Sequence, residues 1–95
     1  MIGKKVIVRA AKAGVFFGTL VKWENDTVIL KNARKLWYWS GAGAVEGIAR
    51  NGVSNPDSCK FTVWVDEIGI TGVSQIIPTT KKADNIIEEV AEWKV

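Results

Sequence analysis

A run of three consecutive aromatic residues, Trp37-Tyr38-Trp39, constrains the fold of this chain more than any other feature. The run follows the basic residue Arg34 and precedes a stretch of small residues at 41–44. In an extended segment successive side chains point to opposite faces, so Trp37 and Trp39 share one face and Tyr38 lies on the other. One face can enter a core, and the other needs a helix, a partner subunit or a planar ligand to lie against. The run therefore indicates a binding module.

Length and composition are typical of one folded domain that spans residues 1–95, with 47% hydrophobic and 24% charged residues. The longest apolar runs, such as Ala13–Phe17, are far too short to cross a bilayer, so no membrane partner is expected. The first residues lack the apolar core of a signal peptide. The single cysteine, Cys59, fits a reducing compartment. We therefore expect the protein to be cytoplasmic.

The chain contains no histidine, which removes Ser-His-Asp and Cys-His relays and the usual zinc sites. The neighbouring carboxylates Asp66 and Glu67 would point to opposite faces of a strand and could not share a proton. The glycines Gly41 and Gly43 lack the spacing of a phosphate-binding loop. We expect a protein that is not an enzyme, with no catalytic residue, no metal and no cofactor.

The net charge of +3 is unevenly distributed along the sequence. Residues 1–60 contain ten basic and four acidic side chains, whereas residues 61–95 contain three basic and six acidic ones. This segregation indicates either a basic binding face or an acidic C-terminal helix that complements its own or a neighbouring subunit.

Alternating and β-branched residues predict strands over Lys4–Ala10, Val15–Trp23, Thr27–Lys31, Lys60–Ile70 and Val73–Ile77, with Ala33–Trp39 as a further strand or an irregular edge. Gly18 lies inside one of these segments and indicates a bulge or a sharp bend. Helical spacing predicts a short helix that includes 44–49 and stops at Asn51-Gly52, and a C-terminal helix over Lys81–Trp93 that Thr79 or Thr80 caps. The prediction is an α+β domain, either a small antiparallel β-barrel or a curved sheet of five to six strands, with one short inserted helix and a C-terminal helix.

Several stretches together resemble a family of short bacteriophage proteins of uncharacterised function. They are Arg9 with Ala13–Gly18, Leu30–Trp39 with Gly41-Ala42, Cys59–Phe61, Val65–Ile68, Ile76–Thr79 and Trp93-Lys94. The resemblance covers nearly the whole chain and implies a phage accessory protein in the cytoplasm of a host bacterium. Small phage proteins of this kind are often inhibitors of host defence, and some are oligomers that sequester nucleotide-derived signals. This expectation comes from context, because a fold does not determine a function.

The first interpretation is a homo-oligomeric, non-enzymatic protein with a pocket for a small nucleotide-like ligand. Six residues are predicted to bound this pocket: Arg34, Trp37, Tyr38, Trp39, Arg9 and Arg50. The aromatic rings would stack on a base, and the arginines would hold phosphate.

Three alternatives remain open at this point. Trp37 and Trp39 would fill the core while Tyr38 lies at a subunit contact, as aromatic residues commonly do. Basic strands with exposed aromatic residues are also typical of small barrels that bind single-stranded nucleic acid. The third alternative is a protein–protein or virion assembly component with no ligand.

Overall fold

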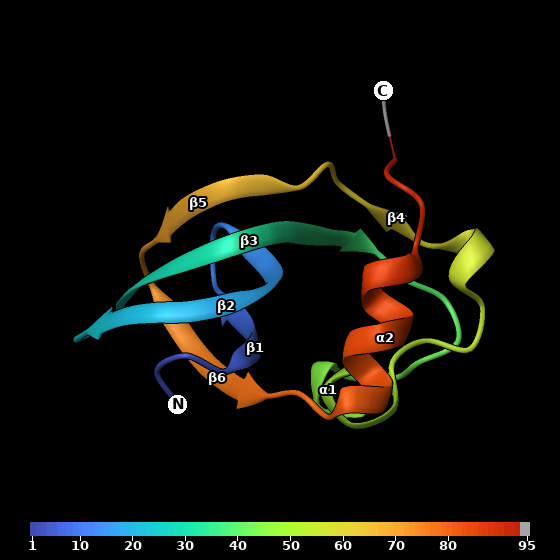
Figure 1. The fold of residues 1–95 in the computed structure, drawn as a ribbon, viewed down its shortest axis with the longest axis horizontal. Coiled ribbons are helices and arrows are strands. Elements are labelled where there is room, and N and C mark those ends of the chain that lie inside the picture. Colours follow the sequence, from blue (N-terminus) through green and yellow to red (C-terminus); the bar gives the residue numbers. More distant parts are fainter. Residues whose placement is uncertain (94–95) are drawn as a thin grey trace.

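The fold is a curved six-stranded sheet with two helices on one side (Figure 1). The computed structural model describes residues 1–93. Its strands are β1 (Lys5–Ala10), β2 (Gly14–Glu24), β3 (Thr27–Tyr38), β4 (Lys60–Phe61), β5 (Val65–Ile70) and β6 (Val73–Pro78). The helices are α1 (Val45–Asn51) and α2 (Lys81–Glu89), with a short 3-10 turn at Pro56–Ser58.

Every strand pair in the sheet is antiparallel, and the order is β4-β3-β2-β1-β6, with β5 also paired to β3. The long strand β3 therefore carries β2 on one side and both β4 and β5 on the other. The strands curve round without closing into a ring. The prediction of a curved sheet is confirmed, and a closed barrel is not supported.

A bulge bends the sheet where β2 meets β3. The predicted strands Thr27–Lys31 and Ala33–Trp39 are in fact one strand, because Asn32 adopts a left-handed backbone (φ 49°) that adds a residue without ending the pairing. Opposite it, Gly18 has room for no side chain, since a Cβ there would lie 2.9 Å from the Cβ of Ala33. The bulge predicted from Gly18 is confirmed.

The predicted strand Lys60–Ile70 is split into β4 and β5, so that prediction was wrong over its middle. The Thr62 N–H still donates to the Lys35 carbonyl of β3 at 2.9 Å, but two other backbone groups of this middle segment bond to side chains. The Thr62 carbonyl accepts a hydrogen bond from Arg34 Nε at 3.1 Å, and the Trp64 backbone N–H donates to Glu92 Oε2 at 2.9 Å. Side chains distant in the sequence thus take the place of strand partners.

The C-terminal helix begins as predicted but ends earlier. The Thr80 hydroxyl caps α2 by accepting from the Ala83 backbone N–H at 3.1 Å. The helix stops at Glu89 instead of Trp93, because Val90 adopts an extended backbone (φ −62°, ψ 126°). The segment after it runs onto β4, where the Trp93 N–H donates to the carbonyl of Phe61 at 2.8 Å.

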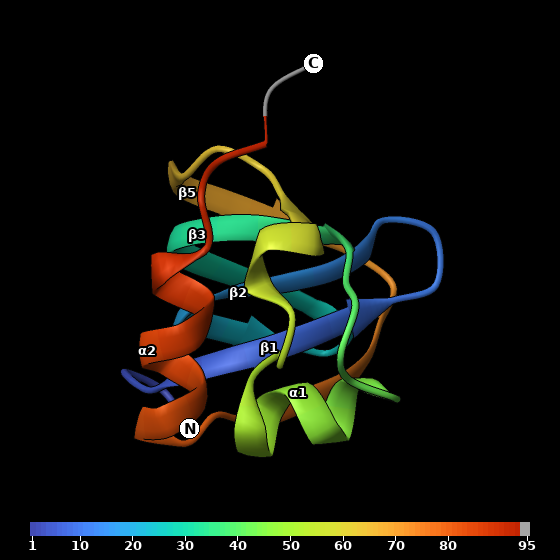
Figure 2. The same cartoon turned by 90° about the vertical axis from the view of Figure 1, so that its right-hand side faces the viewer.

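The inserted helix α1 ends as the sequence predicted, at Asn51 followed by Gly52 with φ 73°. Figure 2 shows α1 and α2 together in front of the sheet. They cover a cluster of buried residues that includes Ile48 of α1, Ile87 of α2 and Phe17 of the sheet. A second cluster contains strand residues only, among them Val8, Leu20 and Leu30, and packs between the curved strands.

Candidate functional site

Arg34, predicted to hold phosphate, lies in the interior with only 1% of its surface exposed. Its guanidinium donates hydrogen bonds to four backbone carbonyls: Thr62 (3.1 Å), Ile87 (3.0 Å), Val90 (2.8 Å) and Phe61 (3.3 Å). The Ile87 and Val90 carbonyls lie at the C-terminal end of α2, where helix carbonyls lack intrahelical partners and a cation is favourable. Arg34 therefore caps this helix from the sheet.

The Arg34 guanidinium also lies between two aromatic rings, 5.5 Å from the centroid of Phe61 and 4.8 Å from that of Trp64. Burial lowers the pKa of this guanidinium from its ordinary value, and the charge of Glu92 acts in the opposite direction. Arginine tolerates such a site because its charge is weakly hydrated and its pKa is very high. An anion at the surface would not reach this group, which corrects the role that the sequence indicated for Arg34.

The aromatic triplet divides between the interior and the surface. Trp39 packs against the helix-side core and donates from Nε1 to the Gly43 carbonyl at 3.2 Å. Trp37 is 52% exposed and Tyr38 is 50% exposed. A second irregularity of β3, between Leu36 and Tyr38, disturbs the simple alternation of faces and leaves both neighbours at the surface. Trp39 is partly buried, so the core interpretation holds for it in part, and it does not hold for Trp37.

The exposed aromatic residues Trp37 and Tyr38 form a surface together with Lys60 and Trp93, two residues that were not predicted to lie there. Trp37 stacks on Trp93 with the ring centroids 4.7 Å apart and an angle of 12° between the planes. Lys60, which lies opposite Tyr38 in the β3–β4 pair, places its ammonium 5.4 Å from the Trp37 centroid and 5.5 Å from that of Trp93. Trp37, Tyr38, Lys60 and Trp93 are called the aromatic surface below.

The two remaining predicted arginines lie elsewhere. Arg9 is an exposed residue of β1, and β2 separates that strand from β3. Arg50 is in α1, and its carbonyl accepts a hydrogen bond from Thr80 at the N-terminal end of α2. Trp93 follows the other end of that helix, which stops at Glu89. The structure therefore does not bring Arg9 or Arg50 together with the aromatic surface.

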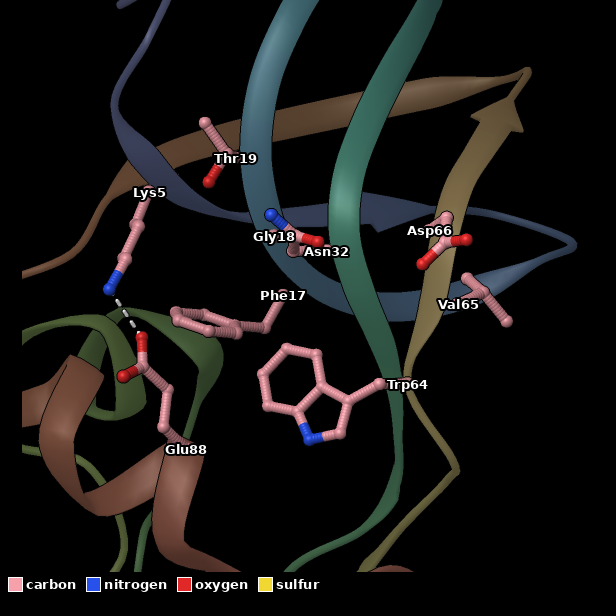
Figure 3. Close-up of a pocket in the computed structure, with 9 residues that line it drawn as sticks. All are labelled: Lys5, Phe17, Gly18, Thr19, Asn32, Trp64, Val65, Asp66 and Glu88. Atoms are coloured by element: carbon pink, nitrogen blue, oxygen red, sulfur yellow. Dashed lines mark hydrogen bonds and ion pairs between the residues drawn. The ribbon is translucent and has the colours of Figure 1, made fainter.

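A separate cavity of about 340 Å³ opens beside the β2–β3 bulge (Figure 3). Its lining residues are Lys5, Phe17, Gly18, Thr19, Asn32, Trp64, Val65, Asp66 and Glu88. Phe17 and Trp64 form its aromatic walls, with ring centroids 6.1 Å apart in an edge-on arrangement. We call it the bulge cavity.

One ion pair spans an edge of the bulge cavity. The Lys5 ammonium of β1 donates to Glu88 Oε2 of α2 at 2.5 Å, as the dashed line in Figure 3 marks. This hydrogen bond raises the pKa of Lys5 from its ordinary value, burial acts against it, and the charges of Glu88 and Asp84 add to the rise. The pair therefore joins the sheet to the helix and keeps Lys5 charged.

Within residues 1–93, no three histidine, cysteine, aspartate or glutamate side chains lie close enough together to hold a metal ion. The same part of the chain has no helix with the length and apolar character needed to span a membrane.

Comparison with known proteins gives one family match. No curated protein and no solved structure matches the chain at a significant level. The family described as "Domain of unknown function (DUF6948)" matches residues 3–87. This range includes Trp37, Tyr38, Lys60 and every lining residue of the bulge cavity except Glu88. Glu88 and Trp93 lie just outside the matched range. Because the match covers most of the sequence, the chain belongs to this family of domains of unknown function.

Proposed function

We propose that this chain is a non-enzymatic binding protein that holds a nucleotide-like ligand on its aromatic surface. The observation that carries the proposal is the Lys60 ammonium above the stacked Trp37 and Trp93 rings, at 5.4 and 5.5 Å from their centroids. A base would stack on the exposed part of Trp37 or Tyr38, and a phosphate attached to it would meet Lys60.

Stacking of a base on an aromatic side chain contributes about 1–3 kcal/mol, and it tolerates any base because every base has a flat π-face. Trp37 and Tyr38 each keep about half of their surface exposed in the monomer. A lysine binds phosphate as a point charge, so Lys60 supports affinity for the phosphate group without fixing its orientation. The proposed surface thus replaces the predicted arginine contacts with one lysine.

A second candidate is single-stranded nucleic acid, for which β3 offers two lysines besides the buried Arg34. Lys31 is exposed on this strand, and Lys35 lies between it and the aromatic surface. These ammonium groups would follow the backbone of a strand that stacks its bases on Trp37 and Tyr38. Several phosphate contacts would make the affinity fall steeply with salt, whereas one bound nucleotide or dinucleotide would give a shallow dependence.

The direct test measures binding of three probes by calorimetry: adenosine monophosphate, a cyclic dinucleotide and a ten-nucleotide thymidine strand. We expect Trp37→Ala to weaken binding of the preferred probe about tenfold or more, as loss of one stacked base implies. Trp23→Ala is the matched control, since Trp23 is 51% exposed on β2 and its Nε1 donates to the Asn25 carbonyl. Equal affinity in both variants, or no binding of any probe, would overturn the proposal.

The biological setting is a further part of the proposal. We propose a phage-encoded homo-oligomer in the host cytoplasm that sequesters a nucleotide-derived defence signal. Its support is the sequence resemblance to short phage proteins. Native mass spectrometry of the protein from an infected, defence-bearing host reports the number of subunits and any retained small molecule. A monomer without retained ligand would remove this setting and leave the probe measurements to decide on the aromatic surface.

A further inference from the structure

The bulge cavity contains three polar side chains that are free to bind a ligand. Thr19, Asn32 and Asp66 line it from β2, β3 and β5, and within residues 1–93 none of their side chains forms a hydrogen bond to another protein group. The cavity differs from a simple packing defect, because it combines these polar groups with the aromatic walls Phe17 and Trp64. Ligand pockets typically combine apolar walls with a few convergent polar groups.

The backbone has an unusual conformation at Asn32, one of these three polar residues. Asn32 has a φ of 49°, a left-handed conformation that is uncommon for residues other than glycine. The bulge places its side chain on the cavity, beside Gly18 and across from Asp66 of the neighbouring strand (Figure 3). Bulges often redirect a side chain next to a functional site, and such backbone outliers gather at binding sites.

The charges of the cavity favour a positively charged ligand. Its lining contains two carboxylates, Asp66 and Glu88, against the single ammonium of Lys5. Lys5 uses only Oε2 of Glu88, so the other oxygen of that carboxylate and both oxygens of Asp66 remain as acceptors. This local balance is the reverse of the protein's net charge of +3. Since Lys5 pairs with Glu88, a phosphate here would meet the like charge of Asp66, which separates this cavity from the aromatic surface.

The aromatic walls suit a cation as well. Trp64 already accepts one cation, since the Arg34 guanidinium lies 4.8 Å from the centroid of its ring, and Arg34 does not line the cavity. The edge-on arrangement of Phe17 and Trp64 offers apolar area for an aliphatic stem.

We propose that the bulge cavity binds a small organic cation, a guanidinium or primary ammonium group on a short apolar stem. The head group donates hydrogen bonds to Asp66 and to the Asn32 amide oxygen, and the stem lies against Phe17 and Trp64. The volume of about 340 Å³ lies at the lower end of the range of about 300–1,000 Å³ that is common for small-molecule pockets. The proposal is independent of the ligand of the aromatic surface.

The test uses agmatine as the probe, which has a guanidinium and an ammonium on a four-carbon stem. Chemical shifts of the amide and indole N–H groups are recorded during a titration of the full chain. We expect the shifts to concentrate on Trp64, Asn32, Thr19 and Asp66, with the indole N–H of Trp37 unchanged. Asp66→Asn keeps the shape and removes the charge, and we expect it to weaken binding about tenfold, as for a hydrogen bond to a charged group.

Two further variants keep the test independent of folding. Asn32→Gly removes the amide, and because glycine adopts φ 49° without strain, the fold is retained while agmatine binds several-fold more weakly. Glu67→Gln is the matched control, since it removes the same charge from the next residue of β5, which does not line the cavity, and its affinity stays within about twofold of the unaltered chain.

Three results would overturn the assignment. The first is an absence of shifts at the cavity up to millimolar agmatine. The second is an equal loss of affinity in Asp66→Asn and Glu67→Gln, which would indicate attraction by the overall field. The third is binding of a neutral nucleoside such as guanosine at the cavity without binding of agmatine, which would show that the ligand class is wrong.

Discussion

Two cations in this protein lie against pairs of aromatic rings, one in the interior and one at the surface. Arg34 is enclosed between Phe61 and Trp64 and donates to four backbone carbonyls. Lys60 lies above Trp37 and Trp93 and remains exposed to solvent. Lys60 is the residue directly before Phe61, so the two cation sites lie next to each other on β4.

The two sites differ in the hydrogen-bond acceptors that each cation has: protein carbonyls for Arg34 and solvent for Lys60. The guanidinium of Arg34 is enclosed and donates to carbonyl oxygens of β4, Thr62 and the end of α2, so removing it takes a buried partner from the Ile87 and Val90 carbonyls, while the Phe61 carbonyl still accepts from the Trp93 N–H. The ammonium of Lys60 keeps its water and gains only ring contacts, which contribute about 0.5–1 kcal/mol at exposed sites. The first cation stabilises the fold, and the second stays available to a ligand.

The largest expected effect is that of Arg34→Met. The variant removes hydrogen bonds to four backbone carbonyls, three of which are buried, so we expect a loss of about 3 kcal/mol in the free energy of unfolding. Urea unfolding followed by circular dichroism measures it. Arg9→Met is the control, because Arg9 is exposed and such surface changes usually stay within about 0.5 kcal/mol. If the free energy of unfolding changes as little in Arg34→Met as in Arg9→Met, Arg34 does not stabilise the fold.

A smaller effect on stability is expected for Lys60→Met, which tests the other half of the comparison. The free energy of unfolding should fall by less than about 1 kcal/mol, because the ammonium is exposed and makes only ring contacts. Binding of the preferred nucleotide probe should weaken at the same time, and most at low salt. If stability falls as far as in Arg34→Met, Lys60 belongs to the fold and not to a ligand site.

The smallest effect concerns a third cation, Lys5, which pairs with Glu88. The folded state raises the pKa of Lys5 above its ordinary value of 10.5, so the contribution of the pair is fully present below this pH and is lost as the pH rises through the folded pKa. Stability measured from pH 9 to 12 should therefore decline more steeply in the unaltered chain than in Lys5→Met. Both side chains are partly exposed, so the difference will be small. Parallel curves would show that the pair contributes nothing.

Local sequence signals were sufficient to predict much of the fold. Gly18 marked the bulge, Asn51-Gly52 marked the end of α1, and Thr80 marked the start of α2. Each of these positions is decided by backbone conformation or by a hydrogen bond within a few residues, so the neighbouring sequence contains the information. The early end of α2 was missed because its carbonyls are bound by Arg34, 56 residues from Val90.

The candidate site was less predictable, because its contacts also join residues that are distant in the sequence. The sequence put all three aromatic residues in one pocket and left a core role open for Trp37 and Trp39, whereas the structure exposes Trp37 and Tyr38 and packs Trp39 against the core. Their cationic partner was expected to be Arg34 because it is near in sequence, yet strand pairing places Lys60 there instead. Asn32 was missed altogether, since asparagine within a strand-like segment gives no sign that its backbone is left-handed.

The contacts of Arg34 also set an order of events in synthesis. This side chain is synthesised 53 and 56 residues before the Ile87 and Val90 carbonyls that accept its hydrogen bonds. Until then the Arg34 guanidinium has no carbonyl acceptors from α2, and the side of the sheet that α2 covers has no helix packed against it. The enclosure of Arg34 is therefore completed only after α2 has been synthesised.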